Sequence, residues 1–387
     1  MLPRNVELSI PKMYDLYLGE NKGRDVGNID LYRKIFNRLN LSFHRPKKDQ
    51  CSLCKMYRDG DEEVKNNLKE TFKKHDYEKN EARKYKKSSK ERAVREKTLV
   101  SAVFDLQQVI HLPITNESAV FYKQKLAVYN FTIYNLATRE CDCYTWNEGI
   151  AKRGASEIAT CVYLFLKRCD MQEKKNVDFF SDGCQGQNKN SILPAMFLYF
   201  LRDSKHIESI THYFFETCHG QNEGDSVHST ISSAISRGGD IFIPSQVIPI
   251  IRLARKKHPY IVHELHVTDF MDFKTLSKEL RLLSIRKCAE NDIDEESINW
   301  TKIITLKVEK SDLAKIYFKS SYLEEKYKSI VLPRNVDLKK NKLKQLYNSY
   351  QKIPEKKYLS LLSLCQGSTP VIRQKEYQDY YKNLPHG

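Results

Sequence analysis

Three aspartates, each beside an apolar run, are the residues of this chain whose type and spacing best suit chemistry. Asp105 lies within the run VSAVFDL, Asp182 ends the run VDFFSD, and Asp225 follows the run ITHYFF. A carboxylate within a buried strand is costly unless a partner compensates its charge. Carboxylate oxygens are the ligands that Mg²⁺ prefers, and a pair of such ions supports hydrolysis and transfer of phosphodiesters. We therefore expect Asp105, Asp182 and Asp225 to converge on Mg²⁺ or Mn²⁺.

The spacing after the third aspartate adds a histidine to this set. In a two-metal site, Asp105 would bridge both ions, Asp182 would hold one and Asp225 the other. His228 shares a helical face with Asp225 and could orient a phosphate or a metal-bound water. Each acid taken singly could instead be a surface charge, and Asp225 could be a helix cap. Two rival acids are Glu148 and Glu157, the second of which could also cap its own helix or pair with Arg153.

The elements that must position these residues alternate between strand and helix. The segments KLAVYNFTIYNL and ECDCYTW predict two strands joined by a hairpin. GASEIATCVYLFLK has apolar residues at helical spacing, and ILPAMFLYFL is apolar enough for a buried helix. The acids then fall on the first strand, the fourth strand and the last helix of a pattern that few other common folds use. We expect an α/β fold with an RNase H-like core, a mixed five-stranded sheet flanked by helices.

These patterns predict that the chain is divided into three parts. We expect an N-terminal helical region over 1–98, the RNase H-like core over 99–245 and a C-terminal α/β and helical extension over 246–387. The charged segment 62–97 contains no Gly or Pro and predicts one long basic helix, either a solvated arm or a DNA-contacting or dimerising element. Further strands are predicted at 260–267 and 303–308, and a helix at 339–351. The string LPRNV occurs twice, beginning at Leu2 and Leu332, and two copies do not make a solenoid.

A CxxC pair in the N-terminal region raises the question of zinc. Cys51 and Cys54 have a spacing that suits tetrahedral zinc, which needs two more ligands. His44 and His75 are the nearest candidates. No second CxxC exists, so a zinc site and a pair of unligated thiols both stay open, while a redox dithiol is disfavoured. A second metal site could be formed by Cys184, Cys218 and His219. For the two cysteines, a buried free thiol is the commoner outcome.

The charge balance predicts a polyanionic partner. The chain has 65 Lys+Arg against 49 Asp+Glu, a net charge of +16, which favours salt-sensitive binding of nucleic acid. No apolar stretch approaches the ~18 residues that a membrane span needs. The ten cysteines are expected to be thiols or metal ligands rather than disulfides. We expect DNA in preference to RNA as partner, no membrane, and leave a homo-oligomer open.

Two segments could contact the nucleic-acid backbone. One is the amide-rich loop after the second aspartate, and the other is a basic segment expected to be a helix face. The alternatives are a tight polar turn and a solvated helix face. The candidate residues are Gln185, Gln187, Asn188, Lys189, Arg252, Arg255 and Lys256.

Five strings in the chain resemble a large family of mostly uncharacterised animal proteins. They are FDLQQ at 104–108, WNE at 146–148, KRGASEI at 152–158, SDGCQGQNKN at 181–190 and DSVHS at 225–229. The family is similar to cut-and-paste transposases with an RNase H-like core, and the likeness covers roughly 32–274. The resemblance implies metal-dependent DNA cleavage and strand transfer, and a nuclear location. In related transposases the aspartate and histidine of the last string accompany the catalytic set.

One position departs from the pattern of that family. Similar proteins have Asp-x-x-His-x-x-x-Glu, whereas this chain has Ser232 at the position of the glutamate. If the glutamate is the third ligand, this protein has lost activity; if Asp225 is the ligand, the set is complete. The first hypothesis is a transposase or transposase-derived DNA-processing protein. The alternative is a non-catalytic DNA-binding or assembly protein that retains the fold, and an RNA-directed nuclease is a third class.

Overall fold

A computed structural model describes residues 9–41, 43, 50–216, 219–220, 222–282, 299–333, 338 and 340–387. The chain divides into two compact units, residues 1–55 and 56–387. In the first unit, helices α1 (Ile10–Glu20) and α2 (Ile29–Arg38) pack through their tyrosines. The ring of Tyr32 lies 5.6 Å from that of Tyr14 and 5.4 Å from that of Tyr17. Aromatic contacts thus hold this small helical pair together.

Helix α3 (Ser52–Asp59) contains the division between the units. Within the second unit, the ring of Tyr57 stacks on that of Phe72 with 3.9 Å between centroids, so the end of α3 packs on the helix that follows it. The 34-residue α4 (Glu62–Arg95) confirms the predicted long helix. The Asp61 carboxylate caps it by accepting a hydrogen bond from the Val64 amide at 2.9 Å.

Helix α4 is docked along one face rather than extended into solvent. Its buried residues share one stripe of small or polar side chains: Glu78, Ala82, Ser89 and Ala93. The Ser89 hydroxyl lies 2.7 Å from Asp178 Oδ2 and 2.9 Å from Ser101 Oγ, on two neighbouring strands. The interpretation of this segment as a solvated arm was therefore wrong for this face. A stripe of small residues lets the helix approach the sheet closely.

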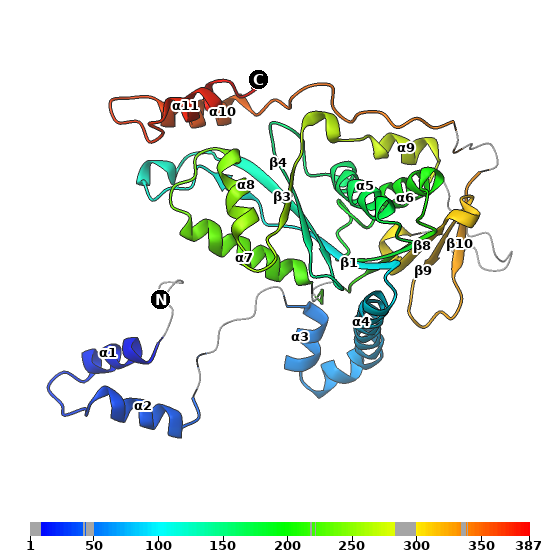
Figure 1. The fold of residues 1–387 in the computed structure, drawn as a ribbon. Coiled ribbons are helices and arrows are strands. Elements are labelled where there is room, and N and C mark those ends of the chain that lie inside the picture. The colour runs from blue at the N-terminus through cyan, green and yellow to red at the C-terminus, as the bar shows by residue number, and fades with distance from the viewer. Residues whose placement is uncertain are drawn as a thin grey trace. The chain divides into compact units, whose positions relative to one another are not determined.

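One mixed sheet of ten strands forms the centre of the second unit (Figure 1). Its strand order is β10-β9-β8-β6-β5-β1-β3-β4-β7, with β2 paired to β3. Strand β1 pairs antiparallel with β3 and parallel with β5; β3 and β4 are antiparallel, and β5 and β6 are parallel. The strands are β1 (Leu99–Leu106), β2 (Ile110–Leu112), β3 (Leu126–Asn135), β4 (Cys141–Asn147), β5 (Asn176–Ser181), β6 (Ser209–Phe214), β7 (Ile261–Glu264), β8 (Thr305–Glu309), β9 (Lys315–Lys319) and β10 (Lys328–Val331).

Helices cover both faces of this sheet (Figure 1). Apolar side chains of α5, α6 and α9 form one core with β1, β5 and β6, and those of α7, α8, α10 and α11 form a second core with β2, β3 and β4. Burial of near-continuous apolar strands between two helical layers is typical of α/β folds. The helices are α5 (Ala155–Met171), α6 (Ile192–Asp203), α7 (Glu223–Arg237), α8 (Pro244–Leu253), α9 (Phe273–Glu279), α10 (Glu355–Leu362) and α11 (Lys375–Lys382).

The C-terminal part differs from the sequence prediction in its helix content. Residues 340–351 form no helix, contrary to the prediction, because this segment crosses the protein in extended form and Gln345 bridges to Met271. Strands β7 to β10 belong to the central sheet, and the boundaries at 98 and 245 stay predictions. The first LPRNV copy and most of the second lie outside the described residues. Among the described helices, none is long and apolar enough to cross a membrane.

Candidate metal centre

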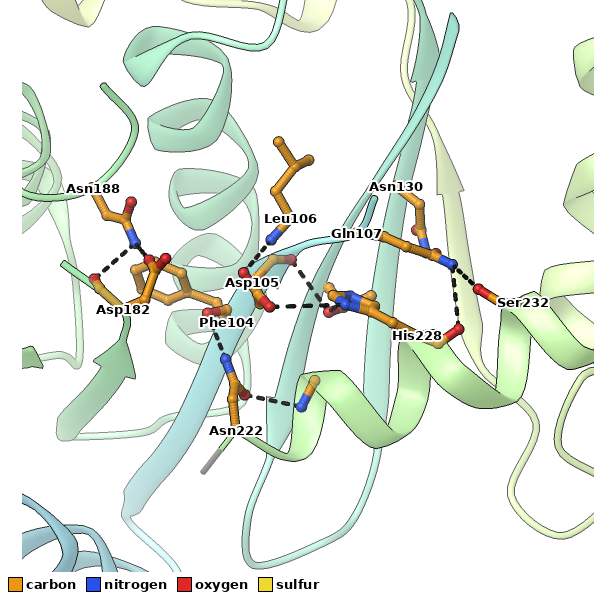
Figure 2. A network of polar contacts seen from close by, with 12 residues as sticks. Phe104, Asp105, Leu106, Gln107, Asn130, Asp182, Asn188, Asn222, His228 and Ser232 are labelled. Atoms are coloured by element: carbon orange, nitrogen blue, oxygen red, sulfur yellow. Dashed lines mark hydrogen bonds and ion pairs between the residues drawn. The ribbon is translucent and has the colours of Figure 1, made fainter. Parts of the chain in front are cut away.

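The structure brings Asp105, Asp225 and His228 together at the end of β1. Figure 2 shows Asp105 and His228 at this position. Their ligand atoms all lie within 4.8 Å of one another. Asp105 comes from the buried strand, whereas the other two lie on the first turns of α7. This group could hold a metal ion, and it contains three of the four residues expected at the centre.

The start of α7 is attached to β1 by an asparagine and a glycine. The Asn222 side chain caps the helix by accepting a hydrogen bond from the Gly224 amide at 2.9 Å. Its amide nitrogen donates to the Phe104 carbonyl, 3.3 Å away. A Cβ at Gly224 would lie only 3.2 Å from the Asp105 Cβ, so glycine permits this close approach. Sequence reasoning missed Asn222, although an asparagine before a helix is a recognisable cap.

The hydrogen bonds of His228 define which of its nitrogens faces the acids. Its Nε2 atom lies 2.8 Å from Thr132 Oγ1, and that hydroxyl is placed to donate to the Asp105 carbonyl at 3.3 Å. The hydroxyl therefore accepts from an Nε2–H group, which assigns the tautomer. Burial lowers the pKa of His228 to about 4, so the ring is neutral at pH 7. The Nδ1 lone pair then points toward Asp105 Oδ2, 3.8 Å away.

Electrostatics at the centre favour a cation. Burial, and then the charges of Asp182 and Asp225, raise the pKa of Asp105 to about 7. Burial also raises the pKa of Asp225, with a further contribution from Asp182. Carboxylates with raised pKa values are destabilised as anions by their surroundings. A bound divalent cation would relieve this repulsion, and the donor set of carboxylate oxygens and one imidazole suits Mg²⁺ or Mn²⁺.

Asp182 lies beside this group rather than within it. It directly follows β5, the parallel neighbour of β1, so both aspartates project from the same end of the sheet. Asn188 holds it: the amide Nδ2 donates to Asp182 Oδ1 at 2.7 Å (Figure 2). The same Nδ2 also donates to the Ser181 hydroxyl at 3.0 Å. This clamp fixes the carboxylate at the border of the site.

Position 232 makes a different contact from the one that a ligand would make. Gln107, which is 3% exposed, donates from Nε2 to Ser232 Oγ at 3.2 Å and to the His228 carbonyl at 3.3 Å. Its own Oε1 accepts from Asn130 Nδ2 at 2.8 Å. Ser232 thus helps to fix α7 against the sheet. Sequence reasoning missed the role of Gln107 and Asn130, because uncharged amide side chains give no charge pattern that would single them out.

The rival acids have structural partners away from this centre. Glu148 Oε1 accepts hydrogen bonds from the Ala127 amide and from Lys357 Nζ, both at 2.8 Å. Glu157 accepts from the Gly154 amide at 3.1 Å and from the Tyr347 hydroxyl. The prediction that Glu157 caps its own helix is therefore confirmed.

Some of the side chains predicted to contact nucleic acid already have partners within the protein, and others are accessible to a ligand. Asn188 is buried at the aspartate, and Lys189 Nζ lies 5.3 Å from the centre of the Phe214 ring, where burial lowers its pKa. Gln185 is exposed and Gln187 half-buried.

The basic segment after α8 also differs from the expected helix face. Only Arg252 lies in the helix, because α8 ends at Leu253 and residues 255–258 form a bend. Arg255 instead donates to the Arg139 and His258 carbonyls at 3.0 and 2.6 Å. Lys256 is exposed. The prediction of one basic helix face was thus wrong.

His75 and His219, both in the second unit, face each other, with their Nε2 atoms 3.0 Å apart. Of the residues predicted as zinc ligands, Cys51 and Cys54 belong to the first unit and His75 to the second. His44 lies outside the described residues, as does Cys218. Cys184 is half-buried in the loop after Asp182, where burial and then the charge of that aspartate raise the pKa of its thiol.

No family model, no curated protein and no solved structure matches this chain.

Proposed function

We propose that this protein is a transposase or transposase-derived DNA-processing protein that hydrolyses phosphodiesters and transfers strands with two divalent metal ions. The observation that carries the proposal is the group of Asp105, Asp225 and His228, whose ligand atoms lie within 4.8 Å of one another. A neutral imidazole that turns its lone pair toward two carboxylates is arranged to share a cation with them. DNA is the proposed substrate, and a nuclear location follows from it.

The strand order around the centre supports the RNase H-like core that we propose. Strands β4, β3, β1, β5 and β6 are consecutive in the sheet. The first three are mutually antiparallel neighbours, and the last two run parallel to β1. The sequence pattern predicts such a mixed five-stranded sheet with acids on the first strand, the fourth strand and the last helix; Asp105 lies in β1, Asp182 directly follows β5 and Asp225 lies in α7.

Each residue has a distinct part in the proposed reaction. Asp105 and Asp225 would hold the ions through carboxylate oxygens, and His228 through Nδ1, while Asn188 keeps Asp182 oriented toward the same end of the sheet. When bound, the ions would activate the attacking water or 3′-hydroxyl and stabilise the leaving oxygen. Thr132 fixes the imidazole so that its lone pair is always presented to the site.

The net charge of +16 supports a polyanionic substrate. Exposed Gln185 and Lys256 remain available for backbone contacts, while the binding of the duplex would rest on the charge of the whole chain. Duplex DNA is proposed ahead of RNA because the family that the chain resembles is similar to DNA transposases.

A nicking assay tests this function. Supercoiled plasmid is incubated with the full chain and Mg²⁺ or Mn²⁺, and nicked product is expected. Asp105→Asn should abolish nicking, because loss of one ligand removes nucleophile activation and leaving-group stabilisation together. Asp240→Asn, at an exposed loop position, is the matched control and should nick at the wild-type rate. Equal nicking by wild type and Asp105→Asn would contradict the proposal.

Ser232 favours a second candidate, a DNA-binding protein that keeps this fold without catalysis. Ser232 has no carboxylate to offer a metal ion, and its hydroxyl accepts a hydrogen bond from Gln107 at 3.2 Å, at the position where similar proteins have glutamate. If wild type binds DNA without nicking it and Ser232→Glu gains nicking, this second function holds. If wild type nicks, Asp225 is sufficient as the third carboxylate.

A further inference from the structure

A cavity of about 480 Å³ lies within the second unit, where the C-terminal segment meets the end of strand β4. The start of α8 and the end of β7 complete its wall, in which Ile150, Pro244 and Leu384 lie beside several polar side chains. A cavity of about 300–1,000 Å³ with apolar walls and a few polar groups is typical of a small-ligand site. The residues of the candidate metal centre do not line it, so it is a separate site.

Two tyrosine rings, those of Tyr350 and Tyr380, supply flat surfaces in this cavity. The amide that follows Tyr350 donates to the Gly149 carbonyl at 2.7 Å, which holds this part of the extended segment at the cavity. Helix α11, which contains Tyr380, is fixed because the Tyr381 hydroxyl donates to the Phe242 carbonyl at 2.5 Å. Rings held in this way offer their faces to a planar ligand at little cost in conformational entropy.

An amide and a carboxylate in the cavity wall have hydrogen-bonding groups to spare. Asn147 Oδ1 accepts from the Gly149 amide at 2.9 Å, and its Nδ2 group donates to no other residue in the described part of the chain. The Glu264 carboxylate has no hydrogen bond or ion pair with a described residue. Burial, and then the charges of Glu148 and Glu264, raise the pKa of the Tyr380 hydroxyl. The wall thus presents an N–H donor and an anionic acceptor beside two aromatic faces.

This combination selects a planar, uncharged group with donors at its edge. The negative charge of Glu264 repels phosphate, so the sugar and phosphate of a nucleotide would stay outside the cavity. Its oxygens can accept from the exocyclic amino group that adenine, cytosine and guanine carry and thymine lacks. Aromatic faces stack on any nucleobase. A nucleobase with an amino group meets all these requirements.

The cavity lies on the face of the sheet that carries the candidate metal centre. Asp105 pairs with Thr132 of β3, and Val128 of β3 pairs with Asn147 of β4. Because Val128 and Thr132 are four residues apart, all four of these side chains point to the same face. The cavity is about 14 Å further along the strands than Asp105 and about 10 Å across them. At about 3.4 Å for each nucleotide step, one DNA strand covers this distance in about five nucleotides.

We propose that this cavity binds a nucleobase that carries an exocyclic amino group. The base stacks against Tyr350 and Tyr380, Glu264 accepts from its amino group, and Asn147 donates to one of its acceptor atoms. The inference rests on the proposed function for its choice of a nucleobase, and it adds a second contact to the same DNA. Two sources offer this chemistry, an unstacked base of the DNA substrate and a free nucleotide.

A fluorescence titration of the full chain in the presence of EDTA tests the site without a metal ion. The first ligand is the deoxynucleotide of 2-aminopurine, an amino-bearing base whose emission is quenched when it stacks. We expect quenching on binding, and displacement by dAMP, dCMP and dGMP at concentrations at least about five-fold lower than by TMP. Glu264→Gln, at an exposed position, should reduce this preference to within about two-fold, because the amide can also donate to thymine.

Variants of the exposed tyrosine keep the test independent of folding. Tyr350 is 61% exposed, so Tyr350→Ala should leave the fold intact while lowering affinity by about five-fold or more, the usual effect of losing a stacking ring. Tyr350→Phe keeps the ring and should bind within about two-fold of wild type. Tyr122→Ala changes an exposed tyrosine outside the cavity and is the matched control, with unchanged affinity.

A second arm distinguishes the two sources of the base. A duplex with 2-aminopurine at an unpaired position replaces the free nucleotide. Quenching with the duplex alone assigns the site to DNA, and quenching with the nucleotide alone assigns it to a free ligand. No quenching in either arm, or equal affinity for wild type and Tyr350→Ala, would overturn the proposal. Plasmid nicking without nucleobase binding would overturn this inference alone, whereas nucleobase binding without nicking would count against the proposed reaction alone.

Discussion

Nδ1 of His228 lies 3.8 Å from Oδ2 of Asp105, and this nitrogen carries a lone pair rather than a proton. The imidazole is neutral because burial lowers its pKa to about 4, and its proton is on Nε2, which faces Thr132 at 2.8 Å. An ionised Asp105 and this lone pair repel each other, and a cation between them would relieve that repulsion. We therefore propose the space between Asp105 and His228 as the place for a metal ion.

Thr132 should control metal affinity through His228. Thr132→Val removes the hydroxyl that accepts the Nε2 proton, so the ring loses its fixed tautomer and orientation. We expect Mn²⁺ affinity to fall by about 10–100-fold, the usual effect of losing such a partner. Thr132→Ser keeps the hydroxyl and should retain affinity within about three-fold of wild type. Calorimetric titration measures both, and an unchanged affinity in Thr132→Val would contradict the assigned tautomer.

Glu78 should hold helix α4 to the C-terminal part of the sheet. This buried carboxylate accepts hydrogen bonds from the Tyr322 amide at 2.9 Å and from the Ser321 hydroxyl. Glu78→Ala leaves both donors unsatisfied and should lower the free energy of unfolding by about 2–3 kcal/mol. Exposed Glu91 on the same helix is the control, and Glu91→Ala should cost less than about 0.5 kcal/mol. Urea unfolding that shows equal stability for both variants would contradict the docking of α4.

Asp170 should make the stability of the folded protein depend on pH in the acidic range. Partial burial raises its pKa, but hydrogen bonds from the Lys205 amide, the Ser204 hydroxyl and the amides of His206 and Ile207 outweigh burial and lower the pKa to about 2. A group with a lowered folded-state pKa contributes stability that is present above the unfolded value, about 3.9, and is lost as pH falls toward 2. Thermal unfolding should show wild type more stable than Asp170→Asn at pH 6, with the Tm difference shrinking toward pH 3. A Tm difference that increases as the pH falls would refute this linkage.

DNA binding and cleavage should be separable at Asp182. A net charge of +16 should give duplex affinity that falls by more than about ten-fold between 50 and 200 mM salt, through counterion release. Asp182→Asn removes a negative charge near the site and should bind at least as tightly as wild type, while losing cleavage. Fluorescence anisotropy across salt concentrations measures this. A duplex affinity that does not change with salt concentration would argue against nucleic acid as the partner.

The elements that carry the candidate centre could be predicted because their sequence signals are local. A lone charge in an apolar run marked Asp105, and a strand followed by a short polar segment placed Asp225 at the start of a helix. The structure confirms both elements. The order of apolar segments also indicated the hairpin of β3 and β4.

Contacts between distant segments could not be predicted in the same way. His219 lies beside His75, 144 positions away in sequence, and their meeting depends on how α4 packs on the sheet, which no local pattern encodes. The charged α4 looked solvated because its buried stripe consists of small and polar residues instead of large apolar ones. Residues 340–351 were predicted as a helix from polarity alone, whereas tertiary contacts such as the Gln345 bridge hold them extended.

Pulsed electron paramagnetic resonance of bound Mn²⁺ tests the metal centre most directly. The imidazole of His228 should appear as a nitrogen coupled to the manganese in wild-type protein, because Nδ1 faces the carboxylates that would hold the ion. His228→Gln should remove this nitrogen signal, whereas His206→Ala, at an exposed position, should leave it unchanged. Bound Mn²⁺ without a coupled nitrogen, or a nitrogen signal that survives in His228→Gln, would contradict the centre.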